Sequence, residues 1–186
     1  MYTFLSDKIL DEKYYEIMMD WETPIMKEHA EIVTKNGGDI LEIGFGMGIC
    51  SNFIQQTNIK THTIIEINDE IFNRLLEWAK YKPNVIPIKG DWFNSIPKNK
   101  KYDGIMHDTW EDENYDSFVS IAKNYIKSKG IITYYNPNPK KIIENNFKDT
   151  DSKLTLTKID VNPPIKQMKH KYFDRKDYYC IKVVVD

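Results

Sequence analysis

Cysteine is scarce in this chain. Only Cys50 and Cys180 occur among its 186 residues, which is too few for a disulfide framework or for a four-ligand zinc site. No charged segment followed by an apolar one opens the sequence, so no secretory leader is indicated. A reducing compartment is the simplest setting for such a composition, and we expect a cytoplasmic protein.

Long hydrophobic runs and net charge are missing as well. No apolar run approaches the roughly 18 to 20 residues that a membrane-spanning helix needs. The formal charge is only −2, which provides no global attraction to nucleic acid. We therefore expect neither a membrane nor a nucleic-acid partner; the partner is a small molecule or a protein, and the oligomeric state stays open.

The chain does contain enough apolar material for a sizeable core. Hydrophobic residues make up 41% of it and aromatic residues 13%, which argues against disorder, and the length suits a single domain over residues 1–186.

Strand-like and helix-like segments alternate along this domain. Short apolar runs rich in β-branched residues predict five strands, at residues 40–43, 63–65, 85–88, 102–107 and 131–135. Apolar residues at helical spacing follow a Thr23-Pro24 start signal and occur again over residues 71–79. A third helix is predicted from Phe118 to a stop signal at Lys129-Gly130, and a short one over residues 140–147. Two alternating segments, 154–161 and 178–185, come last without a helix between them. This order predicts an α/β fold, a Rossmann-like class I methyltransferase with a mostly parallel sheet and an antiparallel C-terminal strand.

Three glycines spaced two apart follow the first of these strands: Gly44, Gly46 and Gly48. Glycine lets the backbone turn tightly and approach a ligand that any Cβ would exclude. Glu66 ends the next strand, where a carboxylate can accept both hydroxyls of a ribose. The pattern Gly-x-Gly-x-Gly differs from the Gly-x-Gly-x-x-Gly of dinucleotide-binding folds, in which a helix N-terminus binds the pyrophosphate. S-adenosylmethionine (SAM) has no phosphate, so the observed spacing favours SAM over NAD. A glycine turn without a ligand is the alternative.

Longer motifs carry a family resemblance. Trp21-Glu22-Thr23-Pro24, Phe45-Gly46-Met47-Gly48 and Asp108-Thr109-Trp110, with the segments at residues 64–69 and 85–92, occur in the order and at nearly the spacing of one family. In these stretches the chain resembles guanidinoacetate N-methyltransferase and the related δ-arginine methyltransferases, which are class I SAM-dependent methyltransferases. The resemblance covers roughly residues 14–136. It implies a single SAM-dependent methyltransferase domain with an N-terminal lid segment at residues 1–23.

The resemblance also implies a small guanidino substrate and two catalytic carboxylates, Glu22 and Asp108. A guanidinium, with a pKa above about 12, holds its proton tightly, yet the attacking nitrogen must present a lone pair. Two carboxylates can accept paired hydrogen bonds from the planar guanidinium group, direct one nitrogen at the methyl group and accept the proton. We expect Asp108 to be the principal proton acceptor and Glu22 the clamp; a loop role for Asp108 and a solvated role for Glu22 are the alternatives.

The remaining candidate residues follow from the same motifs. The expected cofactor-binding residues are Glu42, Gly44, Gly46, Met47, Gly48, Glu66, Asn68, Asp91, Trp92 and Asp108. The expected substrate-binding residues are Trp21, Glu22, Asp108, Thr109, Tyr135 and Tyr178. No metal site is expected. Core packing is the alternative for Trp92 and the default for Met47, and His29 on the first helix is expected in the core.

Departures from the family leave the acceptor open. His107 and Trp110 stand where the family has tyrosines, Tyr135 stands where it has a cysteine, and the lid is short. A SAM methyltransferase for another acceptor, recognised by His107 and Trp110, and a non-catalytic SAM-binding protein are therefore the competing hypotheses. We expect Asn162-Pro163-Pro164-Ile165 to be unrelated to the similar motif of nucleic-acid-methylating enzymes, because it follows the sixth strand, and the basic residues between 166 and 176 to form a solvated loop.

Overall fold

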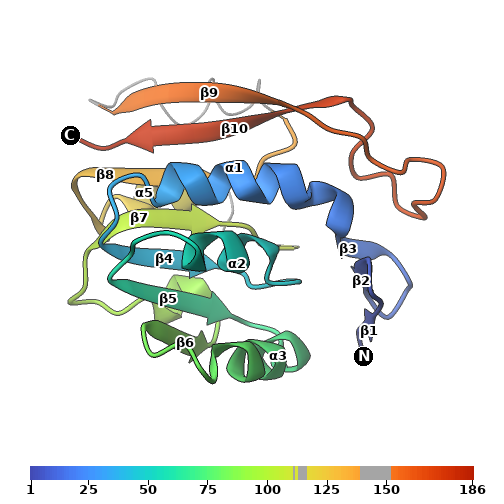
Figure 1. The fold of residues 1–186 in the computed structure, drawn as a ribbon, viewed down its shortest axis with the longest axis horizontal. Coiled ribbons are helices and arrows are strands. Elements are labelled where there is room, and N and C mark those ends of the chain that lie inside the picture. Colours follow the sequence, from blue (N-terminus) through green and yellow to red (C-terminus); the bar gives the residue numbers. More distant parts are fainter. Residues whose placement is uncertain (111, 113–116, 139–151) are drawn as a thin grey trace.

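The computed structural model describes residues 1–110, 112, 117–138 and 152–186. Its centre is a seven-stranded sheet in the order β6-β5-β4-β7-β8-β10-β9 (Figure 1). The parallel strands are β4 (Asp39–Ile43), β5 (Thr61–Glu66), β6 (Val85–Lys89), β7 (Tyr102–His107) and β8 (Ile126–Tyr134). β10 (Asp177–Val184) pairs antiparallel with β8 and with β9 (Lys153–Asp160). The predicted mostly parallel sheet with an antiparallel C-terminal strand is confirmed.

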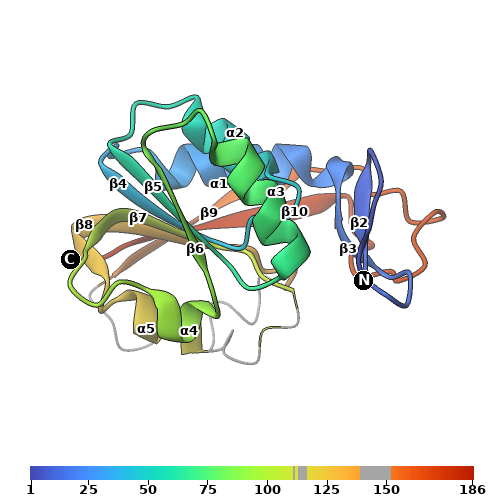
Figure 2. The ribbon, with the colours of Figure 1, turned by 90° about the horizontal axis from the view of Figure 1, so that it is seen from below.

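Helices cover both faces of this sheet (Figure 2). On one face lie α1 (Thr23–Val33), α2 (Ile49–Gln55) and α3 (Asp69–Ala79), and on the other lie the short helices α4 (Trp92–Ser95) and α5 (Phe118–Ala122). Parallel strands buried on both faces explain the nearly continuous apolar runs of the sequence. None of the helices in the described ranges combines the length and apolar character that crossing a membrane requires.

A small second sheet precedes the central one. It comprises β1 (Thr3–Phe4), β2 (Lys8–Leu10) and β3 (Glu16–Met19), followed by a 3-10 turn, η1 (Asp20–Glu22). Figure 1 shows it beyond the carboxyl ends of β4, β5 and β7. The backbone N–H of Tyr2 donates to Glu70 Oε1 at 3.1 Å, which attaches this sheet to α3. The sequence did not predict it, because strands of two to four residues carry too little alternation to be recognised.

The prediction for residues 118–135 was wrong in its boundaries. The helix ends at Ala122, and β8 begins at Ile126 rather than at Ile131. The backbone N–H of Tyr102 donates to Tyr125 O at 2.8 Å, and Ile126 pairs with Tyr102, so sheet pairing replaces the helical turn. Lys129 adopts a φ of 62° next to Gly130 and bends the strand without ending it. The helix expected over residues 140–147 lies outside the described residues.

Helix α1 begins near the predicted place, but Thr23 is its first residue and Glu22 its N-cap. Its apolar face packs on the sheet with His29 fully buried. His29 Nδ1 lies 2.6 Å from Thr133 Oγ1 and its Nε2 lies 3.3 Å from Tyr178 Oη. Burial lowers the pKa of His29 to about 3, so the ring stays neutral. The expectation of a core histidine is confirmed.

Gly104 sets the distance between α1 and the sheet. A Cβ at this position would overlap the carbonyl oxygen of Val33 and lie 2.8 Å from Val33 Cγ2. We predict that Gly104→Ala lowers the free energy of unfolding by roughly 3 kcal/mol, because α1 must move off the sheet. Urea denaturation measures this change, with the exposed Ser120→Ala as control. A loss as small as that of the control would show that α1 adapts without cost.

Candidate active site

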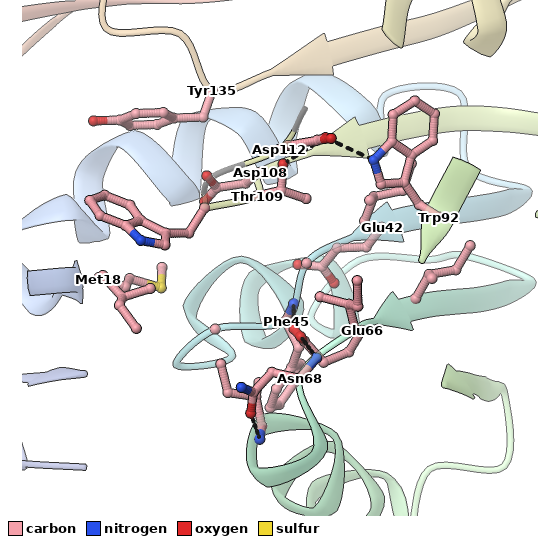
Figure 3. A pocket seen from close by; sticks show the side chains of 18 of the residues that line it. Met18, Glu42, Phe45, Glu66, Asn68, Trp92, Asp108, Thr109, Asp112 and Tyr135 are labelled. Atoms are coloured by element: carbon pink, nitrogen blue, oxygen red, sulfur yellow. Dashed lines mark hydrogen bonds between the residues drawn. The ribbon is translucent and has the colours of Figure 1, made fainter. Parts of the chain in front are cut away.

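The carboxyl ends of the parallel strands open into a cavity of about 360 Å³ (Figure 3). Open α/β sheets place their ligands at this edge. The lining comes from the loops after β4, β5, β6, β7 and β8, from the small N-terminal sheet, and from Tyr172 in the segment between β9 and β10. The site is therefore assembled from the whole length of the described chain.

The glycine turn after β4 forms one wall. Gly44, Gly46 and Gly48 have φ angles of 88°, 52° and 72°, which favour glycine. Gly44 and Gly46 line the cavity, whereas Gly48 is the N-cap of α2. Met47 packs among the apolar residues beneath the turn. Neither Met47 nor Gly48 lines the cavity, so their predicted contact with a cofactor is not seen in this geometry.

Glu66 lies at the end of β5 as the sequence predicts, and it is buried. Its Oε2 accepts the backbone N–H of Phe45 at 3.0 Å, and its Oε1 accepts that of Asn68 at 2.7 Å. Burial raises the pKa of Glu66, and these hydrogen bonds oppose the rise. The Asn68 side chain caps α3 by accepting the N–H groups of Glu70 and Ile71. Both residues line the cavity in fixed orientations (Figure 3).

Glu42 lies on the floor of the cavity, at the penultimate position of β4. Its Oε2 accepts the hydroxyl of Ser51 at 2.6 Å and lies 2.8 Å from His62 Nε2. All three residues are buried. Sequence reasoning missed Ser51 and His62, although a histidine within the apolar β5 segment is a signal of a buried polar partner. The network holds one orientation of the Glu42 carboxyl group.

Glu22 and Asp108 line the same cavity. Glu22 is 4% exposed, and its Oε1 accepts the N–H of Met19 at 2.9 Å and the hydroxyl of Tyr172 at 2.8 Å. Burial, and then the charge of Asp108, raise the pKa of Glu22 to about 8. Burial and the charge of Glu42 raise the pKa of Asp108 to about 7. Like charges held close together in low dielectric favour the neutral form of each group.

Trp92 and Thr109 also line the cavity, together with Asp112, which the sequence did not single out. Asp112 Oδ2 accepts Trp92 Nε1–H at 2.8 Å and the Thr109 hydroxyl at 3.0 Å, and it lies 2.9 Å from His107 Nε2. His107 itself is fully buried and stacks on Phe118 with ring centroids 4.2 Å apart. It therefore supports the wall from behind, and the expectation that it faces the acceptor does not fit this position.

Two further predicted residues lie one layer behind the cavity. Trp21 packs on Phe173, with ring centroids 5.4 Å apart, and donates from Nε1 to the Tyr172 hydroxyl at 3.2 Å. Tyr178 is fully buried and stacks on Tyr135 at 5.2 Å. Tyr135 lines the cavity, as do Asp91 and Trp110. Trp21 and Tyr178 thus hold lining residues in place without reaching the cavity.

The charge of the lining has one sign. Among the described lining residues there is no lysine, arginine or histidine. The acidic lining residues are Glu22, Glu42, Glu66, Asp91, Asp108 and Asp112. The described residues contain no group of three or more histidine, cysteine or acidic side chains placed to hold a metal ion. Such a lining suits an organic cation.

Solved structures with the same fold are methyltransferases. The chain superposes on precorrin-6y C5,15-methyltransferase from Geobacter metallireducens with a TM-score of 0.67, 13% identity, and coverage of 96% of this chain and 93% of that one. It superposes on the N-methyltransferase NodS from Bradyrhizobium japonicum, in complex with S-adenosyl-L-homocysteine, with a TM-score of 0.66, 12% identity, and coverage of 89% and 87%. The fold is therefore that of Rossmann-like class I methyltransferases.

Curated relatives share more of the sequence. Protein arginine N-methyltransferase 2 of Candida glabrata is 31% identical over an alignment of 207 residues, gaps included. The alignment covers 97% of this chain and 50% of the relative. The protein of the same name from Saccharomyces cerevisiae is 29% identical over 189 residues, which cover 88% and 46%. This chain thus spans about half the length of the relatives it matches.

A sequence profile described as guanidinoacetate N-methyltransferase matches residues 5–176. The match includes the glycine turn, Glu66, both candidate catalytic carboxyls and Tyr172. It confirms the resemblance seen in the sequence motifs. The chain belongs to the guanidinoacetate N-methyltransferase family.

Proposed function

We propose that this chain is a SAM-dependent N-methyltransferase that acts on a guanidino compound. The observation that carries the proposal is that one cavity is lined by the glycine turn, by Glu66 and by the two carboxyl groups of Glu22 and Asp108. Family membership and the relatives named protein arginine N-methyltransferase 2 support it.

The residues present fit SAM. Gly44 and Gly46 line the cavity in a turn with positive φ angles, and the Glu66 carboxyl group lines it at the end of β5, where it would accept the ribose hydroxyls. Asp91 and Trp92, which line the cavity, would hold the base, and Glu42 would contact the amino-acid end of SAM. When bound, SAM supplies an electrophilic methyl group on a sulfonium.

The two carboxyls would orient and deprotonate the acceptor. An arriving guanidinium places a positive charge between Glu22 and Asp108, which lowers the pKa of both groups and ionises them. The ionised pair then accepts N–H bonds from the planar fork and aims one nitrogen. The ionised Asp108 carboxylate would then accept the proton that the attacking nitrogen releases on methylation.

The acceptor we favour is arginine-like and has no free carboxylate. The described lining has no basic residue to pair with a carboxylate. The backbone of residues 136–138, after β8, does not offer N–H groups to a carboxylate either. Asn136 N–H donates to the Tyr178 hydroxyl, Pro137 has no N–H, and Asn138 N–H donates to Asn136 Oδ1. An arginine side chain in a peptide meets these conditions better than guanidinoacetate does.

Residues 1–23 would act as the lid of this single domain. Ile17 and Met18 of β3 line the cavity, together with Tyr2, which precedes β1. Covering the bound molecules with these side chains excludes water, which strengthens the interactions of the charged groups inside.

We predict methyl transfer from labelled SAM to an arginine-containing peptide and to argininamide, at least about tenfold faster than to guanidinoacetate or free arginine. Arginine and argininamide form a matched pair that differs only in the carboxylate. Equal rates for this pair would refute the preference. SAM binding without transfer to any guanidino compound would favour another acceptor or a non-catalytic SAM-binding protein.

Asp108→Asn should lower kcat by about 100-fold or more, because the side chain keeps its size and loses its ability to take a proton. The affinity for SAM, measured by calorimetry, should fall far less than kcat does. Asp160→Asn, at an exposed position on β9, is the control and should leave kcat unchanged. An undiminished rate in Asp108→Asn would exclude Asp108 as the proton acceptor.

A further inference from the structure

The segment between β9 and β10, residues 161–176, is anchored to the N-terminal sheet. Glu16 of β3 is 3% exposed, and its two carboxylate oxygens accept the backbone N–H groups of Lys169 and His170, each at 3.0 Å. Met168 and Phe173 are also buried. The expected solvated loop is therefore only partly correct, because the lysine side chains are exposed while the backbone between them is fixed.

This anchoring brings Tyr172 to the cavity. Its hydroxyl donates to Glu22 Oε1 at 2.8 Å and accepts Trp21 Nε1–H at 3.2 Å. Its ring lies 6.1 Å from that of Trp21 and 6.3 Å from that of Trp110. The hydroxyl thus has one defined acceptor and one defined donor, 150 residues from Glu22 in sequence.

We propose that Tyr172 is a positioning residue for methyl transfer, which holds the Glu22 carboxylate in the orientation that grips the acceptor. The proposal rests on the proposed function. Glu22 is buried and close to a second acid, so its ionised, oriented form depends on donors. Among the described residues, the Met19 amide and the Tyr172 hydroxyl donate to its Oε1.

The ionisable groups around Glu22 determine the direction of the effect. Asp108 after β7 raises the pKa of Glu22, and the hydroxyl of Tyr172 lowers it. Burial and the nearby charges of Glu22 and Asp108 raise the pKa of Tyr172 far above its ordinary value, and the pKa of Tyr135 after β8 is raised as well. Both tyrosines therefore remain protonated at neutral pH. Removing the Tyr172 hydroxyl moves the pKa of Glu22 above about 8 and leaves less carboxylate at neutral pH.

Tyr172→Phe tests this role, because it keeps the ring on Trp21 and Trp110 and removes only the hydroxyl. With the guanidino acceptor that the unmodified chain uses, we expect kcat/KM at pH 7.5 to fall about tenfold, since a hydrogen bond to a charged group is lost. The rise of kcat/KM with pH should move to higher pH by about half a unit or more. The affinity for SAM should not change. Tyr125→Phe, on the far side of the sheet, is the control.

Titration of the carboxyl carbon of Glu22 by NMR gives a readout that does not depend on activity, and its midpoint should rise in Tyr172→Phe. An unchanged rate and pH profile would overturn the proposal, and so would an equal loss at every pH with an unchanged Glu22 midpoint, which marks a merely structural role. An unmodified chain that binds SAM and methylates no guanidino acceptor overturns the proposed function instead.

Discussion

The close approach of the ends of β4 and β7 is the constraint on which the site depends. A Cβ at Gly44 would overlap the carbonyl oxygen of Asp108, so only glycine permits the ends of β4 and β7 to lie this close. The N–H of Gly44 donates to Ile65 O, and that of Asp108 donates to Ile43 O. This pairing brings the carboxyl ends of three neighbouring strands, with Glu66 and Asp108, around one cavity.

Several acidic side chains are buried together in the cavity, which disfavours their ionised forms, and a bound cation would offset this effect. Burial raises the pKa of Glu22, Glu66 and Asp108, and the charge of a neighbouring acid adds to the effect at Glu22 and Asp108. A sulfonium and a guanidinium are both cations, and each stabilises nearby carboxylates in the ionised form. The same electrostatics would therefore favour binding of the two proposed reactants and disfavour anions.

Long-range contacts complete the wall around Glu22. Glu16 from the N-terminal sheet fixes the backbone of residues 169 and 170, and Tyr172 then reaches Glu22. Both partners of these contacts come from segments outside the parallel part of the sheet. Open α/β sheets bind ligands at the carboxyl ends of their strands. The part of the cavity wall around Glu22 is built by other segments, namely the N-terminal sheet and residues 161–176.

The sequence by itself determined the parallel sheet, the glycine turn, the position of Glu66 and the family, because these depend on local patterns of apolar residues, glycine φ angles and contiguous motifs. It misplaced the start of β8 and missed the N-terminal sheet, where pairing with other strands outweighs local spacing. Only the tertiary structure decided that Trp21 and Tyr178 lie behind the wall, that His107 is buried, and that Tyr172 contacts Glu22. Those outcomes depend on contacts between residues far apart in the chain, which no local pattern encodes.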